Sequence, residues 1–175
     1  MTSSSSVFLV GPMGVGKTTI GRMLAETLGL EFVDSDREIE AATGADIPWI
    51  FDVEGEAGFR VRESRMIDQL SQRSNVVLAT GGGAILAADN RRWLAERGTV
   101  IYLRAPISQL IDRTKRDKTR PLLQTANPAQ KIRDLMALRE PLYQEVAHLT
   151  VDTCRRGPKA VCAEIQRQIV ADENP

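Results

Sequence analysis

Gly11-Pro12-Met13-Gly14-Val15-Gly16-Lys17-Thr18 matches G-x-x-x-x-G-K-[ST], the pattern of a phosphate-binding loop. Glycines let the backbone turn tightly, so that successive N–H groups face the oxygens of a phosphate. Lys17 can reach the β- and γ-phosphates of a nucleotide, and the Thr18 hydroxyl can bind Mg²⁺. The stretch therefore predicts a nucleotide site at the start of a helix, where backbone dipoles attract anions.

The residues on either side of this loop supply the strand and the helix that it requires. Residues 7–10 form a short apolar run of the kind found in a buried strand. After the loop, apolar residues recur at helical spacing up to Leu28, and Gly29 can end the helix. The alternative is a glycine-rich turn that binds nothing, and the presence of strand, loop and helix in order disfavours it.

Composition limits the class of protein. The chain has 175 residues, of which 42% are hydrophobic, which suits one domain with an ordinary core. Its 23 basic and 23 acidic residues give a net charge of zero, which argues against a nucleic-acid or membrane-surface binder. No signal peptide and no bilayer-spanning run is visible, so we expect a monomer in the cytoplasm. Residues 1–6 are expected to be a flexible tail.

The cysteines predict neither a metal site nor a disulfide framework. Cys154, Cys162 and the nearby His148 match no zinc-binding spacing. Cys162 lies on an apolar helical stripe, so it is expected to be a small buried side chain. This use of cysteine is typical of a reducing compartment.

Strand and helix patterns alternate along the chain, which predicts a parallel sheet with helices on both faces. The expected strands are five apolar runs at residues 7–10, 32–34, 76–80, 99–103 and 149–151. Helices are expected from the second strand to Gly44, from Asp46 with a restart at Gly55, after Pro106, from Asn127-Pro128-Ala129-Gln130, and after Gly157-Pro158. The helical pattern is lost after Ile111, and the polar run that follows is expected to be irregular up to Asn127.

Ligands of such sheets bind beyond the carboxyl ends of the strands, where two aspartates follow the second strand. Asp34 is the candidate acid for Mg²⁺, because the third strand ends in Thr80 rather than in an aspartate. Asp36 is the candidate for orienting or deprotonating an accepting hydroxyl. The alternative is a pair of solvated acids that cap the next helix, and spacing alone does not separate the two readings.

Gly81-Gly82-Gly83 follows the third strand and contains more glycine than a strand-to-helix turn needs. We expect a ligand to approach this backbone closely, most simply an anion held by N–H groups. Arg60 and Glu63 share one side of a predicted helix, and a surface ion pair is the favoured alternative for them. Arg139 lies on an apolar stripe, so it either extends to solvent or reaches a carboxylate.

The segment from Arg104 to Arg120 holds six basic and two acidic residues. A solvated loop is the usual explanation of such a run. Its alternative is a mobile flap whose arginines neutralise charge during phosphoryl transfer.

Five segments in this order resemble the shikimate kinase family over nearly the whole chain. They are Gly11–Thr18, Asp34-Ser35-Asp36, Ile50–Glu63, Thr80–Gly83 and Arg120-Pro121-Leu122-Leu123. The first segment is common among nucleotide-binding proteins, whereas the combination is specific.

The resemblance implies a three-layer α/β/α fold like that of nucleoside monophosphate kinases, with a five-stranded parallel sheet, a shikimate-binding helical region and a lid. It implies a single kinase domain over residues 1–175, with the phosphate loop at 11–18, the substrate region at about 35–65 and the lid at about 114–127. The implied reaction is phosphorylation of the 3-hydroxyl of shikimate by ATP with Mg²⁺, in aromatic amino-acid biosynthesis. The alternative enzyme is a kinase for another small hydroxylated acceptor, such as gluconate. A nucleotide-dependent switch is a second alternative, but the chain lacks the Asn-Lys-x-Asp motif that reads guanine. A nucleic-acid binder is a third, and it would use the Arg104–Arg120 run.

Residue roles follow from the same resemblance. Catalysis is implied for Asp36, Lys17 and Arg120, with Glu63 orienting Arg60. Shikimate contacts are implied for Asp36, Arg60, Glu63, Gly81, Gly82, Gly83, Arg120 and Arg139. ATP contacts are implied for Gly11, Met13, Gly14, Val15, Gly16, Lys17, Thr18, Thr19, Arg113, Arg120, Arg156 and Pro158, with Arg113 over the adenine and Arg156 and Pro158 beside it. Thr18 and Asp34 are implied to serve the metal, and Lys115, Arg116 and Lys118 receive no role.

Overall fold

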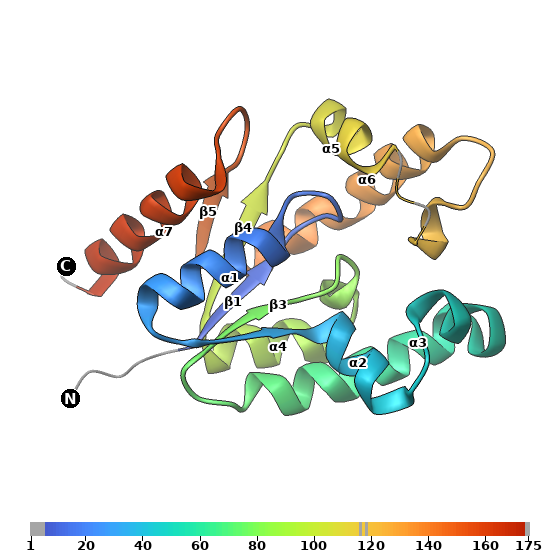
Figure 1. The fold of residues 1–175 in the computed structure, drawn as a ribbon, viewed down its shortest axis with the longest axis horizontal. Helices are drawn as coiled ribbons and strands as arrows, with labels where there is room; N and C mark the ends of the chain where they lie inside the picture. The colour runs from blue at the N-terminus through green and yellow to red at the C-terminus, as the bar shows by residue number, and fades with distance from the viewer. Residues whose placement is uncertain (1–5, 116, 118, 174–175) are drawn as a thin grey trace.

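A parallel five-stranded sheet forms the centre of the protein (Figure 1). The computed structural model describes residues 6–115, 117 and 119–173. The strands lie in the order β2-β3-β1-β4-β5, and every neighbouring pair is parallel. Their bounds are β1 Val7–Val10, β2 Glu31–Asp34, β3 Val76–Ala79, β4 Thr99–Arg104 and β5 Leu149–Asp152. The five predicted strands are confirmed.

Helices cover both faces of the sheet, because each parallel crossover returns the chain over one face. Helices α1 and α7 pack together on one face, while α3, α4 and α6 pack on the other (Figure 1). The strands β1 and β3 are therefore buried along their whole length, which explains their continuous apolar sequences. Helix bounds are α1 Lys17–Leu28, α2 Ser35–Thr43, α3 Ile47–Ser71, α4 Ala88–Arg97, α5 Ile107–Thr114, α6 Pro128–Val146 and α7 Pro158–Glu173, with short 3₁₀ turns η1 Ala84–Leu86 and η2 Pro121–Leu123.

Three predicted helix ends are confirmed by their caps. Gly29 ends α1 in the left-handed conformation at φ 68°. The Asp46 carboxylate accepts a hydrogen bond from the Trp49 N–H at 2.9 Å, at the start of α3. Asn127 likewise accepts from the Gln130 N–H at 3.1 Å. The Gln130 side chain points along α6 to Asp134 instead of back to the cap, so only half of a capping box forms.

Helix α3 is interrupted at Gly55, whose φ of 72° and ψ of 177° lie outside the helical region. The break lets the first part of α3 fold back, so that the rings of Phe51 and Phe59 lie 4.8 Å apart. Phe59, Ile50 and Ile39 of α2 form a small core that is separate from the main core on the sheet. The predicted restart of the helix at Gly55 is confirmed.

Two expectations about irregular segments are wrong in part. Ser6 was expected in a flexible tail, but it is 4% exposed, and its hydroxyl donates to the Arg73 carbonyl at 2.9 Å. Residues 1–5 of that tail lie outside the described part of the chain. Helix α5 continues past Ile111 to Thr114, whose hydroxyl bonds the Leu110 carbonyl at 2.7 Å. Within the polar run, η2 places Leu123 in the core at 4% exposure.

Two further observations bear on the class of protein. Across the described residues, no helix has both the length and the apolar character needed to cross a membrane. Cys162 is buried as expected, and both cysteines are free thiols. His148 accepts a hydrogen bond from the Val100 N–H at 2.9 Å, so its ring nitrogen has a structural partner in the sheet.

Replacing the cap of α6 tests the local stability of this helix. Asn127→Ala removes the acceptor of the Gln130 N–H and should destabilise the fold by about 1 kcal/mol. For a chain of this size, that loss should lower the Tm by about 2–4 °C in a thermal melt. Asn127→Ser retains a capping oxygen and is the matched control. A Ser variant that melts as low as the Ala variant would contradict the role of the cap.

Candidate functional site

A pocket of about 500 Å³ lies at the carboxyl edge of the sheet, and we call it the edge pocket. It is lined by residues of the phosphate loop, α2, α3, the turn at Gly81–Gly83 after β3, the η2 region and α6. All of the residues implied for shikimate and for the metal are among those that line it. The functional candidates in the lining are Met13, Thr18, Asp34, Asp36, Arg60, Glu63, Gly81, Gly82, Gly83, Arg120 and Arg139.

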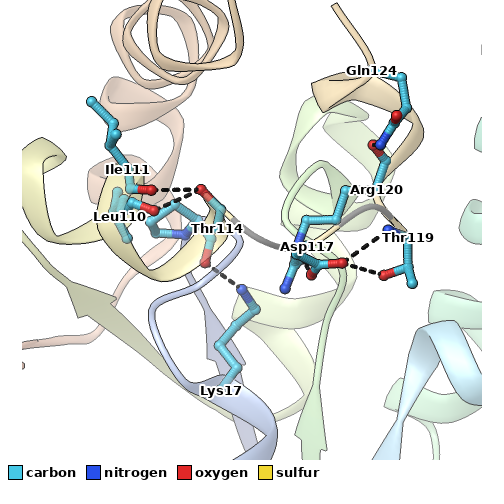
Figure 2. Close-up of polar contacts among 9 residues, drawn as sticks. Lys17, Leu110, Ile111, Thr114, Asp117, Thr119, Arg120 and Gln124 are labelled. Carbon is cyan, nitrogen blue, oxygen red and sulfur yellow. Dashed lines mark hydrogen bonds and ion pairs between the residues drawn. The ribbon is translucent and has the colours of Figure 1, made fainter.

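The phosphate loop is held open by left-handed glycines, with φ 80° at Gly14 and φ 102° at Gly16. A Cβ on Gly14 would also lie 2.8 Å from the Thr114 methyl group, so only glycine fits under the end of α5. The Lys17 ammonium donates to the carbonyls of Gly11 at 2.6 Å and Pro12 at 2.8 Å. Figure 2 shows the Lys17 side chain pointing toward Thr114.

Burial lowers the pKa of Lys17 to about 7, and the nearby Arg120 charge adds to the effect. Burial makes the charged form of Lys17 unfavourable while no anion is bound. A bound anion stabilises that charged form, and the stabilisation is larger here than for an ammonium in water. This arrangement suits a group that neutralises phosphate oxygens.

Thr18 lies at the start of α1 and faces Asp34 at the end of β2. The Thr18 hydroxyl donates to Asp34 Oδ2 at 3.0 Å. The other carboxylate oxygen of Asp34 accepts from the N–H groups of Asp36 at 3.0 Å and Arg37 at 3.3 Å. Asp34 therefore caps α2, as the alternative reading expected, and it also faces Thr18, while its role at a metal stays a prediction. Asp36 is only partly exposed and lines the edge pocket, where its Oδ1 is buried.

These oxygens fit a magnesium ion that takes its other ligands from phosphates and water. The described residues contain no group of three or more His, Cys, Asp or Glu side chains able to hold a metal by themselves. Mg²⁺ in phosphate-transfer sites needs only one or two protein oxygens, because it keeps several waters.

Asp36 and Glu63 lie on either side of Gly81, where a Cβ would be 2.8 Å from Asp36 Oδ1 and 3.0 Å from Glu63 Oε2. Burial, and then the charge of Glu63, raise the pKa of Asp36 to about 7. These two oxygens are buried and lack a hydrogen-bond partner among the described residues. Unpartnered buried acceptors cost free energy, so they indicate a ligand that brings O–H donors.

Arg60 binds Glu63 at 2.8 Å and Glu56 at 3.2 Å. The alternative of a surface ion pair is wrong for Glu63, whose side chain is only 2% exposed. A Cβ on Gly83 would lie 2.4 Å from Arg60 Nη1, so glycine is the residue that admits this guanidinium. Burial lowers the pKa of Arg60, but the carboxylates of Glu63 and Glu56 raise it by more. The net effect is a raised pKa, so Arg60 stays charged.

Arg139 is 2% exposed, so the alternative that it extends to solvent is wrong. Its Nη1 lies 3.5 Å from the position of a Cβ on Gly82. The Nε atoms of Arg139 and Arg60 are buried donors without a partner among the described residues. Two such cations in one pocket are suited to a carboxylate, which each guanidinium fork matches.

The three glycines are explained by three close approaches, from Asp36 at Gly81, Arg139 at Gly82 and Arg60 at Gly83. We call Gly81–Gly83 the glycine turn. Its N–H groups are not all free for an anion, because the Gly81 N–H donates to the Ser35 hydroxyl at 3.1 Å. Sequence reasoning gave Ser35 no role, and its only signal was its position between two functional aspartates.

A second hollow of about 180 Å³ lies on the other side of the phosphate loop, and we call it the loop cleft. It brings together several residues implied for ATP from four segments of the chain. They are Val15, Gly16, Thr19, Arg113, Arg156 and Pro158. Arg113 also donates to the loop carbonyls of Val15 at 3.0 Å and Gly14 at 3.2 Å. The loop thus separates two places where different molecules can bind.

Arg120 reaches the edge pocket from the η2 region, where its Nε donates to Asp117 Oδ2 at 2.7 Å (Figure 2). Asp117 also accepts from the Thr119 hydroxyl at 2.6 Å. Asp117 was not predicted as a site residue. Its only signal in the sequence is an acid three residues before Arg120, in a basic run. Lys115 lies in the turn after α5, while Arg116 and Lys118 lie outside the described residues.

Comparisons with known proteins agree with this geometry. The Shikimate kinase family model matches residues 13–170. A shikimate kinase of Chromohalobacter salexigens is 58% identical over 168 residues, which cover 96% of this chain and 93% of the relative. One of Acinetobacter baumannii is 54% identical over 168 residues, with the same coverage of 96% and 93%.

Solved structures give the same result. Shikimate kinase from Acinetobacter baumannii in complex with shikimate aligns at TM-score 0.96 and 53% identity, covering 98% of this chain and 96% of that one. A gluconokinase from Sinorhizobium meliloti aligns at TM-score 0.54 and 15% identity over 98% of this chain and 99% of that one, which shows a shared fold alone. The fold is thus the expected nucleoside monophosphate kinase-like one. With a family model over most of its length and relatives above half identity, the chain belongs to the shikimate kinase family.

Proposed function

We propose that the edge pocket holds shikimate and that the loop cleft and phosphate loop hold ATP. As a member of its family, the chain transfers the γ-phosphoryl group of ATP to the 3-hydroxyl of shikimate, giving shikimate 3-phosphate and ADP for aromatic amino-acid biosynthesis. The observation that carries the placement is the set of unpartnered buried atoms in the edge pocket. Two arginine donors match a carboxylate, and two carboxylate acceptors match hydroxyl groups, which are the groups that shikimate carries.

The acceptor is gripped at its two ends. Arg60 and Arg139, with the glycine turn, bind the carboxylate and ring hydroxyls, and Glu63 orients Arg60 through their 2.8 Å ion pair. Asp36 receives the hydroxyl that will be phosphorylated. Its raised pKa, about 7, makes it a better proton acceptor than an ordinary aspartate.

The nucleotide lies along the phosphate loop. Backbone N–H groups of the loop surround its phosphates, while Lys17 and Arg120 neutralise the charge on the migrating group. Arg113 lies over the adenine, with Arg156 and Pro158 beside it. The loop residues assigned to these contacts are Gly11, Met13, Gly14, Val15, Gly16, Lys17, Thr18 and Thr19. Transfer is direct and in line, so catalysis comes mainly from positioning and charge neutralisation.

Mg²⁺ is the proposed cofactor, held by Thr18 directly and by Asp34 through water. When bound, the ion neutralises the β- and γ-phosphate oxygens. Supporting this assignment, the two protein oxygens lie 3.0 Å apart beside the phosphate loop.

Residues 1–175 act as one kinase domain in this proposal, with the acceptor region at about 35–65 and a lid at about 114–127. The protein is proposed to be a monomer. Light scattering of the purified protein measures that state.

An acceptor panel tests the function. With MgATP, ADP release should depend on shikimate and should not respond to gluconate or to a nucleoside monophosphate. ADP release that is equal for gluconate would revive the alternative acceptor.

Asp36→Asn tests the proton acceptor. The variant should bind ATP normally yet lose most of its turnover, by about 10²–10⁴-fold, because Asn cannot accept the hydroxyl proton. A coupled assay for ADP gives the turnover, and calorimetry gives the ATP affinity. Full activity would remove Asp36 from the mechanism.

The same variant carries a pH signature in the ligand-free protein. The raised pKa means that, between about pH 4 and 7, folded Asp36 holds a proton that the unfolded chain has released, so the parent loses stability as the pH rises. The Asn variant lacks this loss, and its Tm should therefore gain on the parent's between about pH 4 and 7. A constant difference across this range would contradict the raised pKa.

Arg139→Ala should raise the KM for shikimate by about tenfold or more, because it removes a buried cation from the carboxylate site. The KM for ATP should stay within about twofold. Arg133→Ala, on the exposed side of the same helix, is the matched control and should change neither value. Equal losses for both substrates in Arg139→Ala would count against its role.

Asp34→Asn tests the metal assignment. The variant should need about tenfold more Mg²⁺ for half-maximal activity, since a neutral amide holds a water ligand less firmly than a carboxylate. A magnesium titration at saturating shikimate and ATP measures this requirement. An unchanged titration curve would exclude Asp34 from the metal site.

A further inference from the structure

Tyr143 of α6 reaches the glycine turn from outside the edge pocket. Its hydroxyl donates to the Gly82 carbonyl at 2.6 Å, across 61 residues of sequence. The residue is 0% exposed, and burial raises the pKa of Tyr143 to about 12. The hydroxyl therefore keeps its proton and remains a donor at neutral pH.

Gly82 is the point where three parts of the site meet. A Cβ at this position would lie 3.3 Å from the Met13 N atom, 3.5 Å from Arg139 Nη1 and 3.7 Å from the Gly11 carbonyl oxygen. A shift of this peptide would therefore move the glycine turn against both the phosphate loop and the buried guanidinium.

The ring of Tyr143 is fixed independently of its hydroxyl. It stacks on Tyr102 of β4 with ring centres 5.1 Å apart and planes at 18°. The Tyr102 hydroxyl points elsewhere and bonds the Glu140 carboxylate, whose other oxygen accepts from Gln144 at 3.0 Å. Because both rings are 0% exposed, the donor to Gly82 has little freedom to move.

Arg139 and Tyr143 are four residues apart on α6, so they share one face of the helix. Arg139 lies beside Gly82, with Nη1 3.5 Å from the position of a Cβ there, and Tyr143 donates a hydrogen bond to the Gly82 carbonyl. Helix α6 thus fixes the distance between the Arg139 guanidinium and the glycine turn, because Arg139 and Tyr143 project from successive turns of the helix.

We propose that Tyr143 is a positioning residue for the acceptor, which fixes the Gly82 peptide so that the glycine turn and Arg139 present one rigid surface to the carboxylate. Tyr143 acts through Gly82 and Arg139 and does not touch the acceptor itself. This inference builds on the proposed placement of shikimate in the edge pocket.

Tyr143→Phe tests the proposal with the loss of one oxygen atom. The ring stack is kept, while the Gly82 carbonyl loses its donor. The dissociation constant for shikimate, measured by calorimetry, should rise about tenfold, since an unsatisfied buried carbonyl lets the turn move. Because Gly82 also adjoins the phosphate loop, the KM for ATP should rise too, but clearly less than the KM for shikimate, and kcat should change less than the KM for shikimate.

Tyr102→Phe is the matched control. It removes the same atom from the stacked partner, whose hydroxyl bonds Glu140 rather than the glycine turn. It should lower the Tm about as much as Tyr143→Phe and leave shikimate binding within about twofold. In an Arg139→Ala background, Tyr143→Phe should cost less than about threefold, because the two residues act on the same peptide.

Three results would overturn the proposal. They are unchanged shikimate binding in Tyr143→Phe, equal weakening of shikimate and ATP, and equal weakening of shikimate by Tyr102→Phe. Failure of the parent chain to bind or phosphorylate shikimate would instead reject the proposed function, so the two failures are distinguishable.

Discussion

Charge that is buried or half-buried at one edge of the sheet is the constraint on which the rest of the site depends. Lys17, Arg60 and Arg139 lie there with Asp36 and Glu63. Moving ions out of water costs several kcal/mol each unless opposite charges and hydrogen bonds offset it. The offset is incomplete, since the pKa values of Lys17 and Asp36 both move to about 7 and several polar atoms lack partners. The burial of the apolar sheet offsets this desolvation free energy. In the proposed function, a bound anion lowers it by pairing with the cations.

Much of the fold could be predicted from the sequence because its signals are local. The buried strands are continuous apolar runs, and the caps at Asp46 and Asn127 need only a few neighbouring residues. The errors arose where distant partners decide the outcome. Ser6 is buried through Arg73, and Leu123 enters a core that no local pattern reveals. The end of α5 was also misjudged, because Thr114 has a polar side chain but satisfies it within its own helix.

The candidate site was less predictable from spacing than from family likeness. Spacing left Arg60–Glu63 as a surface pair and left Arg139 undecided, because exposure depends on tertiary packing. Triple glycine did indicate close approaches, but those in the structure come from the chain's own side chains. The sequence pattern assigns no role to Ser35 or to Tyr143. Each owes its contact to a hydrogen bond with the glycine turn, which no linear pattern encodes.

The break at Gly55 gives the acceptor region a small core of its own, formed by Ile39, Ile50 and Phe59. Phe59 of that core lines the edge pocket, so substitutions there reshape one wall of the pocket. The side of the pocket that meets the small molecule can therefore be altered through residues of α2 and α3, outside the sheet and the phosphate loop. Gly55 is the backbone position that makes this second packing unit possible.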